Sequence, residues 1–291
     1  MNHFVPMCVR LFRHPAESIS EMKKKKMIKF RLIILMVLCA GLLLGAWIVR
    51  GHLIHEPFRT NVRQAFQAPC REYIFGTDNL GRCVACRILY GAATSLYAAV
   101  LAVLAVFIIG TAVGVTAAYA GGIVDRILMK ITLVFQAFPN FILAVAVAGM
   151  LGTGLKNSVL ALGAVYWITY AKLSRSLVLS IRDSEYIRAA KICGAGPTAI
   201  IFKYILPNMV SPLIVTAALD VSSFILSMAG LSFLGLGPSR PTAEWGATMS
   251  EAKTFIQQAP WCIVFPGLAL LVTVVIFNLL GDALRDVIDE G

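Results

Sequence analysis

The stretch Glu185-Tyr-Ile-Arg-Ala-Ala-Lys-Ile-Cys-Gly-Ala-Gly-Pro-Thr-Ala-Ile-Ile-Phe-Lys-Tyr-Ile-Leu-Pro-Asn208 decides the fold class of this chain. It places charged residues and the helix-forming pair Ala189-Ala190 inside a very apolar sequence. The glycines and proline at 194–197 predict a break, and the apolar residues at 200–205 predict a second amphipathic helix. Pro207 is expected to open a new apolar span. The stretch therefore predicts a helix, a glycine turn and a helix between two membrane spans, which is the shape of a loop that docks onto another protein.

These residues resemble the coupling loop of ATP-binding-cassette (ABC) importer permeases, whose motif is Glu-Ala-Ala, three residues, Gly, and a run that ends in Leu-Pro. The matching residues here are Arg188, Ala189, Ala190, Gly194, Leu206 and Pro207. Arg188 replaces the first Glu of the motif, as in the peptide and nickel branch, where an upstream pair like Glu185-Tyr186 is common. The resemblance implies that the loop 183–206 couples this chain to an ATPase. The residues alone leave open an ordinary basic loop between two spans.

The composition predicts an integral membrane protein. The 291 residues are 58% hydrophobic and only 14% charged, whereas a soluble domain carries about a quarter charged residues. The net charge is +11, and the basic residues lie between apolar stretches, as orientation signals do. The sequence has no basic patch rich in aromatic residues, so nucleic-acid binding is not predicted. The seven cysteines are scattered and odd in number, so free thiols are expected.

Long apolar stretches predict six membrane spans, at about 32–49, 92–118, 131–155, 158–179, 207–234 and 262–281, with Lys172 and Arg175 in the fourth and Asp220 in the fifth as the only charged residues. Ala137-Phe138-Pro139 predicts a kink in the third. With the resemblance, they predict an all-α membrane protein with six transmembrane helices and the type I ABC importer permease fold. The expected domains are a basic N-terminal segment 1–31, an anchor 32–49, an extracytoplasmic loop 50–87 and an ABC transmembrane domain 88–285.

The distribution of Lys and Arg predicts the orientation. The N-terminal segment, the turn at 119–130, the region 172–203 and the C-terminus together carry most of these residues. Because the side richer in Lys and Arg is cytoplasmic, both termini and the coupling loop are expected in the cytoplasm, with the chain in the cytoplasmic membrane and in contact with lipid.

A second signature narrows the resemblance. The segment Phe75-Gly-Thr-Asp-Asn-Leu-Gly-Arg82 resembles a signature of dipeptide, oligopeptide and nickel permeases, in which the next residue is Asp; here it is Cys83. Peptide-type members carry Glu where this chain has Met228. The resemblance therefore favours nickel or a metal chelate as the substrate, with di- or oligopeptides as the alternative.

Asp220 is the one carboxylate inside a predicted span. A charge there is unfavourable and normally faces a cavity or a partner. Asp220 is therefore expected either to lock its helix to neighbours or, with Met228, to line the translocation path of a cationic substrate.

Cys83-Val-Ala-Cys86 is a single CxxC, preceded on the same predicted loop by His52 and His55. Alone it is a weak metal or redox signal. The favoured interpretation is two small residues one turn apart at the start of a helix, so no metal site is predicted; the alternative is a transient metal contact at the outer mouth.

The sequence contains no Gly-x-x-x-x-Gly-Lys-Ser/Thr phosphate loop, so the chain is expected to be a transport subunit without cofactor, not an enzyme. The resemblance implies a second homologous permease, two ATP-binding subunits and an extracytoplasmic solute-binding protein. An ion-driven secondary transporter would need inverted repeats and more ionisable groups in its spans. A membrane-embedded enzyme would need a motif such as His-Glu-x-x-His, which is absent from the sequence.

Overall fold

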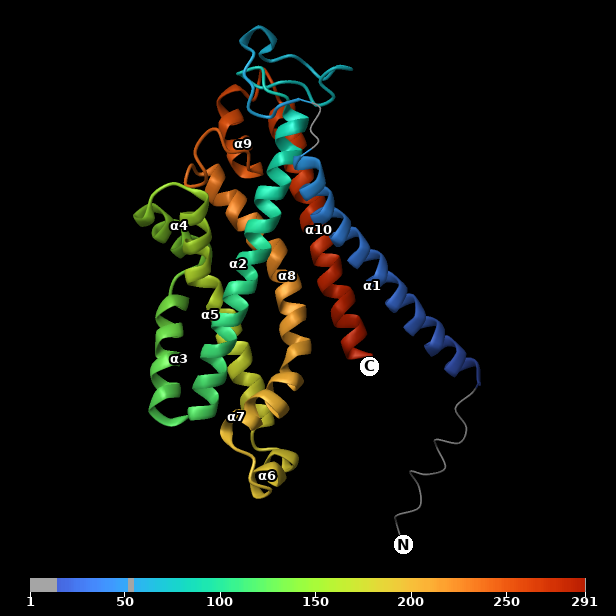
Figure 1. Cartoon of the computed structure of the whole chain (residues 1–291), viewed down its shortest axis with the longest axis vertical. Coiled ribbons are helices and arrows are strands. Elements are labelled where there is room, and N and C mark those ends of the chain that lie inside the picture. The colour runs from blue at the N-terminus through green and yellow to red at the C-terminus, as the bar shows by residue number, and fades with distance from the viewer. Residues whose placement is uncertain (1–14, 52–54, 291) are drawn as a thin grey trace.

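The computed structural model describes residues 15–51 and 55–290. The first 14 residues of the predicted N-terminal segment, and His52, lie outside the described residues. The described chain is a bundle of long helices, the first of which diverges from the others toward its N-terminal end (Figure 1). These are α1 (Pro15–Arg50), α2 (Val84–Ala120), α5 (Leu155–Ile181), α8 (Leu206–Phe233) and α10 (Trp261–Asp289). The short helices α6 (Glu185–Ile192) and α9 (Trp245–Ala252) lie at opposite ends, which we call the α6 end and the α9 end.

The helices confirm an all-α, multi-pass membrane protein. Four of them are long and apolar enough to cross a membrane, namely Lys24–Val49, Val84–Ala120, Pro197–Phe233 and Trp261–Asp289, and a bent pair makes a fifth candidate. The remaining predicted span, 158–179, lies within α5, which carries three basic residues and is less apolar. The Gly154 amide, directly before α5, donates to the Gly237 carbonyl, which follows α8, at 2.9 Å. The C-terminal end of α5 leads into α6, so α5 runs between the two ends of the bundle.

The third predicted span is broken more sharply than expected. It is divided between α3 (Gly122–Gln136) and α4 (Asn140–Leu151), whose axes differ by 89°. Pro139 lacks an N–H and disfavours helix in the residue before it, so the chain leaves α3 at this point. The predicted kink is therefore a bend of about a right angle.

The apolar span expected to open at Pro207 is α8, which has this proline in its first turn, but the helical turn before it is continuous with α8. α7 (Pro197–Ala199) leads into a π-helical turn, η3 (Ile200–Ile205), and this turn continues into α8 without a break. The wider turn accommodates the proline, which has no N–H for a regular helical bond. One continuous helical segment, Pro197–Phe233, therefore runs from the α6 end into the membrane region.

The predicted outer loops contain structure that the sequence did not indicate. The segment after α8 forms α9 and the short η4 (Lys253–Phe255), and the loop before α2 contains η2 (Val62–Gln64). Both lie at the α9 end of the bundle (Figure 1).

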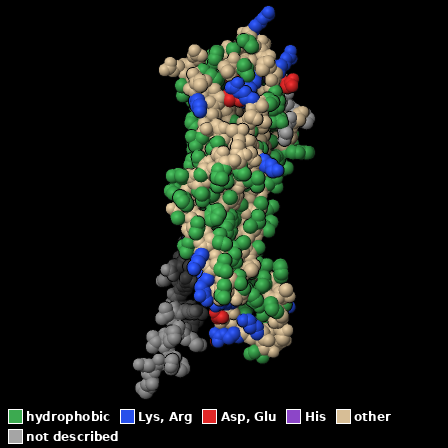
Figure 2. Space-filling model, turned by 90° about the vertical axis from the view of Figure 1, so that its left-hand side faces the viewer, with side chains coloured by type: hydrophobic (Ala, Val, Ile, Leu, Met, Phe, Trp, Pro, Cys, Tyr) green, Lys and Arg blue, Asp and Glu red, His purple; other side chains and the backbone are tan. Residues whose placement is uncertain are grey.

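Close contact between α2 and α5 organises the bundle. Gly110 and Gly114 of α2 lie against the backbone of α5, with no room for a side chain. Small residues four apart let membrane helices approach closely. Around this contact, hydrophobic side chains dominate the middle of the molecule, while Lys and Arg gather toward its ends (Figure 2). An apolar band between charged ends is the surface that a bilayer requires.

Candidate functional site

The predicted coupling motif forms a compact helix and turn at the α6 end. α6 has Glu185 in its first turn and Lys191 in its last, charges that suit the two ends of a helix dipole. At its end the Gly194 amide donates to the Lys191 carbonyl and the Ala195 amide to the Ala190 carbonyl, each at 3.0 Å. This pair of bonds is a Schellman cap. Gly194 has a φ of +84°, which explains why the motif places glycine there.

One side chain anchors α6 to the bundle. Ile187 is completely buried and packs in a cluster with Ile200 and Ile205 of the π-helical turn. The opposite surface of this region exposes large apolar side chains: Ile192 is 86% exposed and Phe202 70%. An exposed apolar surface next to a charged helix is typical of a docking site.

Some of the predicted coupling residues lie on this exposed surface, and others are half-buried beneath it. Ala190 and Leu206 are half-buried, and the remaining residues of the motif are exposed, namely Glu185, Arg188, Ala189, Gly194 and Pro207. The Arg188 guanidinium donates two hydrogen bonds to the Asp183 carbonyl, at 3.0 and 2.9 Å. Arg188 therefore stabilises the start of the loop, a role that the motif's Glu could not fill as an acceptor-only side chain.

Two further contacts connect the α6 end to the rest of the bundle. Arg182, directly before the loop, donates to the Ala118 carbonyl of α2 at 2.7 Å. Arg175 of α5 forms a bidentate ion pair with Asp125 of α3, at 2.5 and 2.6 Å. Because bidentate pairs fix geometry as well as charge, α3 is held to α5 beside the loop, and the start of the loop is held to α2.

Asp220 lies near the middle of α8 and faces α5. Its Oδ2 and the Tyr170 hydroxyl are both buried, and neither forms a hydrogen bond within the described residues. The carboxylate interacts electrostatically with the hydroxyls of Tyr170 and Tyr166. Tyr166 in turn shares a 3.0 Å hydrogen bond with Ser227 of α8. Polar groups therefore concentrate between α5 and α8 at mid-bundle.

Met228 has a different environment. Its side chain is completely buried in the main apolar core of this chain. The structure thus brings the coupling residues together at one end and places Asp220 and Met228 separately on α8. Their part in translocation stays a prediction.

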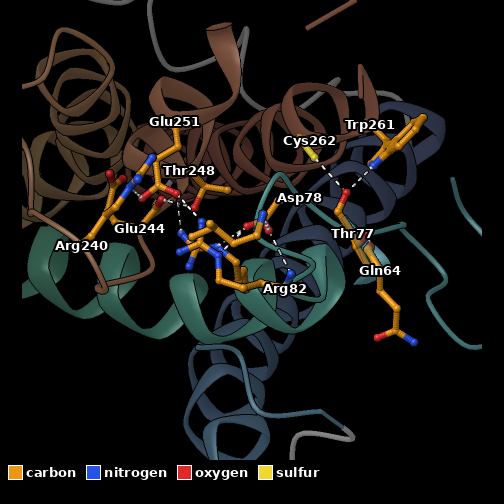
Figure 3. A network of polar contacts seen from close by, with 12 residues as sticks. Gln64, Thr77, Asp78, Arg82, Arg240, Glu244, Thr248, Glu251, Trp261 and Cys262 are labelled. Carbon is orange, nitrogen blue, oxygen red and sulfur yellow. Dashed lines mark hydrogen bonds and ion pairs between the residues drawn. The ribbon is translucent and has the colours of Figure 1, made fainter. Parts of the chain in front are cut away.

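The α9 end holds a buried ionic network that the sequence did not predict (Figure 3). Arg82 donates to the Asp78 carboxylate at 2.6 Å and to Glu251 at 2.5 Å. Arg87 approaches the same Glu251 oxygen at 3.5 Å, and Arg240 approaches the other at 3.3 Å. The side chains of Arg82 and Arg87 are only 3% and 1% exposed. Buried charges persist only when paired, so this network ties the loop before α2 to α9.

The signature at 75–82 owes its glycines to this packing. A Cβ on Gly81 would lie 1.8 Å from the Asn61 carbonyl oxygen, and one on Gly76 would lie 2.7 Å from the Gln67 carbonyl oxygen. Both glycines have a φ of +71°. Trp261 of α10 donates to the Thr77 carbonyl at 3.0 Å, which fixes the same turn from the other side. The signature is therefore a structural turn.

Glu244 is the N-cap of α9. Its carboxylate accepts hydrogen bonds from the amides of Gly246 and Ala247, at 3.0 and 2.8 Å, and from Ser95 at 3.4 Å. Complete burial raises the pKa of this carboxyl group, against the opposing effect of the two amides. The next residue, Trp245, donates to the Ile88 carbonyl at 3.0 Å. These contacts hold α9 against α2.

Comparison with known proteins relates this chain to a family of transport proteins. A family described as binding-protein-dependent transport system inner membrane component matches residues 110–291. A dipeptide transport system permease protein of Alkalihalophilus pseudofirmus is 42% identical over 230 residues, 79% of this chain and 76% of that protein. A nickel transport system permease protein of Escherichia coli K12 is 36% identical over 262 residues, 90% of this chain and 93% of that protein.

Further comparisons agree on fold but differ in named substrate. A glutathione transport system permease protein of Pectobacterium atrosepticum is 41% identical over 223 residues, 77% of this chain and 74% of that protein. Among solved structures, a chain of the inward-facing MetNI methionine ABC transporter matches with a TM-score of 0.57 and 20% identity, covering 70% of this chain and 96% of that chain. At this identity the structural match shows the fold alone.

Proposed function

Because the chain belongs to the family of inner membrane components of binding-protein-dependent transport systems, we propose that it moves solute as an ABC importer permease driven through α6. One observation carries this proposal. α6 projects from the bundle with exposed apolar neighbours, yet it is fastened by the buried Ile187. A surface of this kind transmits a movement imposed by a docked partner.

The proposed assembly has two ATP-binding subunits, of which one docks on α6, and a second homologous permease. A solute-binding protein delivers solute at the α9 end. Closure of the ATPases biases the equilibrium between two conformations only if it acts differently on them, and α6 supplies the contact. This arrangement requires the α6 end and both termini to be cytoplasmic, as the positive-inside rule predicts.

We propose that the substrate is nickel or a metal chelate, with a short peptide as the alternative. The sequence favoured nickel or a metal chelate, and a relative named for nickel supports this candidate. Relatives named for dipeptide and glutathione equally support a short peptide. The buried carboxylate of Asp220 favours a cationic solute if it becomes accessible in another conformation. Uptake of labelled nickel and of a labelled dipeptide, in cells with and without the gene, decides between the two candidates.

Substitution at α6 tests the coupling. Ile192→Asn removes an apolar side chain that is 86% exposed, so the fold should survive. Val62→Asn is the matched control, because Val62 is 72% exposed and lies at the α9 end. The I192N variant should lose co-purification with its ATP-binding subunits, and solute uptake with it. If I192N binds ATPase and supports uptake as well as V62N, α6 is not the coupling surface.

A further inference from the structure

His55, Cys83 and Cys86 form a cluster of metal-ligand side chains at the α9 end. One ring nitrogen of His55 and the two sulfur atoms all lie within 4.8 Å of one another. Both cysteines are buried and His55 is half-buried. The cysteines stand at the start of α2 as expected, since Cys83 is its N-cap and the Cys86 amide donates to the Cys83 sulfur at 3.4 Å. His55 comes from the far side of the preceding loop, and the sequence could not place it.

The surrounding contacts hold the three side chains in position. The His55 ring stacks on Tyr73 with centroids 5.0 Å apart and an angle of 27°. The Tyr73 hydroxyl donates to Gln64 at 3.0 Å. The Val84 amide bonds the Gly76 carbonyl at 3.1 Å, which fixes the start of α2 against the loop. Partners that orient the ligand side chains are a regular feature of metal sites.

The spacing suits a tetrahedral metal ion. Zinc binds thiolate at about 2.3 Å and imidazole at about 2.0–2.1 Å, so two sulfur ligands in a tetrahedral site lie about 3.8 Å apart. The observed limit of 4.8 Å requires each ligand atom to move by less than about 1 Å to reach this geometry. Thiolate and imidazole ligands select zinc and other thiophilic ions over Mg²⁺ and Ca²⁺.

An adjoining cavity gives access to the cluster. Its volume is about 340 Å³, and its lining includes His55, Cys83, Glu56, Glu72 and Arg59. Three protein ligands leave one tetrahedral position open. Water or a solute carboxylate entering through this cavity can fill that position.

We propose that His55, Cys83 and Cys86 bind one Zn²⁺ ion, or an ion of the same ligand preference, and thereby fasten the loop 55–83 to the start of α2. The site does not require the transported solute, because all three protein ligands lie on this chain. Cys83 is also the residue at which the signature at 75–83 departs from its family pattern. The departure thus provides one of the three ligands.

Metal binding to the purified, reduced, full-length chain tests this proposal. After removal of metal with a chelator, we expect one equivalent of Zn²⁺ to bind, measured by elemental analysis and by competition with a chromophoric chelator. Co²⁺ in the same site should show thiolate-to-cobalt charge-transfer absorption. Cys83→Ser, Cys86→Ser and His55→Asn should each weaken Zn²⁺ binding at least about 100-fold, because they remove direct ligands rather than supporting groups.

Cys70→Ser is the matched control, since Cys70 packs against the same small cluster but lies outside the three ligands. It should retain one equivalent of Zn²⁺. Thermal unfolding adds a second readout. Serine is a better N-cap than cysteine, so C83S should unfold at a higher temperature than the wild type without metal and at a lower one with Zn²⁺.

Three results would overturn the site. The first is no Zn²⁺ binding by the wild type, and the second is Zn²⁺ binding by C83S and H55N as tight as that of the wild type. The third is a Cys83–Cys86 disulfide in protein isolated without reductant, seen as a chain lighter by two hydrogens in which neither cysteine reacts with a thiol reagent. H55N keeps both thiols and changes a half-buried side chain, so it remains informative if a cysteine variant fails to fold.

Discussion

Replacing Gly110 or Gly114 with alanine should loosen the bundle, because both lie in the α2–α5 contact. A Cβ at Gly110 would lie 2.3 Å from the Trp167 carbonyl oxygen, and one at Gly114 would lie 2.2 Å from that of Ala171. Ordinary contacts of a Cβ begin at 3.4 Å. Each alanine therefore requires α5 to retreat by about 1 Å, which is the kind of shift that overpacking produces.

The expected loss follows from this displacement. Overpacking a well-packed contact destabilises by about 1–3 kcal/mol, while the better helix propensity of alanine returns up to about 1 kcal/mol. Comparison with Gly149→Ala removes the propensity effect, because Gly149 is also helical and has open space around its Cβ position. Relative to G149A, G110A and G114A should each lose about 1–3 kcal/mol. The double variant should lose less than the sum, since one retreat of α5 relieves both clashes.

Unfolding of the purified chain in mixed micelles by increasing SDS measures these differences, with tryptophan fluorescence as the signal. Trp167 lies at the contact and should report its opening. Free energies of G110A and G114A equal to that of G149A would refute the close approach of α2 and α5. Strict additivity in the double variant would refute the single shared displacement.

Three further predictions concern other parts of the chain. Glu251→Gln removes one of the two carboxylates that pair with the buried Arg82 and Arg87, Asp78 being the other, and should destabilise by about 3–5 kcal/mol. Arg240→Gln removes a 57% exposed partner and should change stability by less than about 1 kcal/mol. Equal effects in the SDS titration would contradict the buried network. Asp220→Asn keeps the shape and hydrogen-bonding capacity of the side chain but removes its charge. If Asp220 lines the translocation path, the variant should lose uptake while assembly and ATPase activity stay intact, and normal uptake at limiting solute would exclude that role. A membrane-impermeant maleimide should label Cys70 but not Cys193 in intact cells, with variants lacking each thiol as controls; labelling of Cys193 from outside would reverse the proposed orientation.

The sequence predicted helices well where the length of an apolar stretch determines the structure. The length of the apolar stretches located α2, α8 and α10, because a bilayer requires about 20 apolar residues to be crossed. Local geometry was less predictable. Pro139 indicated a kink but not its 89° angle, and Pro207 indicated the start of α8 but not the π-helical turn that joins it to the preceding helix. Both outcomes depend on how the chain packs against neighbouring helices, which a local sequence pattern cannot predict.

The candidate sites show the same division. The coupling turn was predictable because its glycine and proline offsets follow from the local capping geometry at Gly194. The ionic network was not, since Arg82 and Glu251 are 169 residues apart in sequence. Each appeared in isolation as a loop charge. His55 was noted upstream of the CxxC, but the sequence could not show that its ring lies within 4.8 Å of both sulfur atoms.

The two ends of the bundle are held by different interactions, and the difference follows their proposed tasks. At the α9 end, Arg82 and Glu251 join the loop to α9 through buried charges, whose separation would leave an uncompensated charge in a dry environment. That end resists deformation. At the α6 end, the loop rests on Ile187 and on the Arg182 bond to a backbone carbonyl, with exposed apolar surface beside it. Because little buried charge must be separated there, a docked partner can move this end by differential binding energy of a few kcal/mol. In the proposed mechanism, the glycine contact of α2 with α5 carries that movement as a shift of closely packed helices rather than as bending.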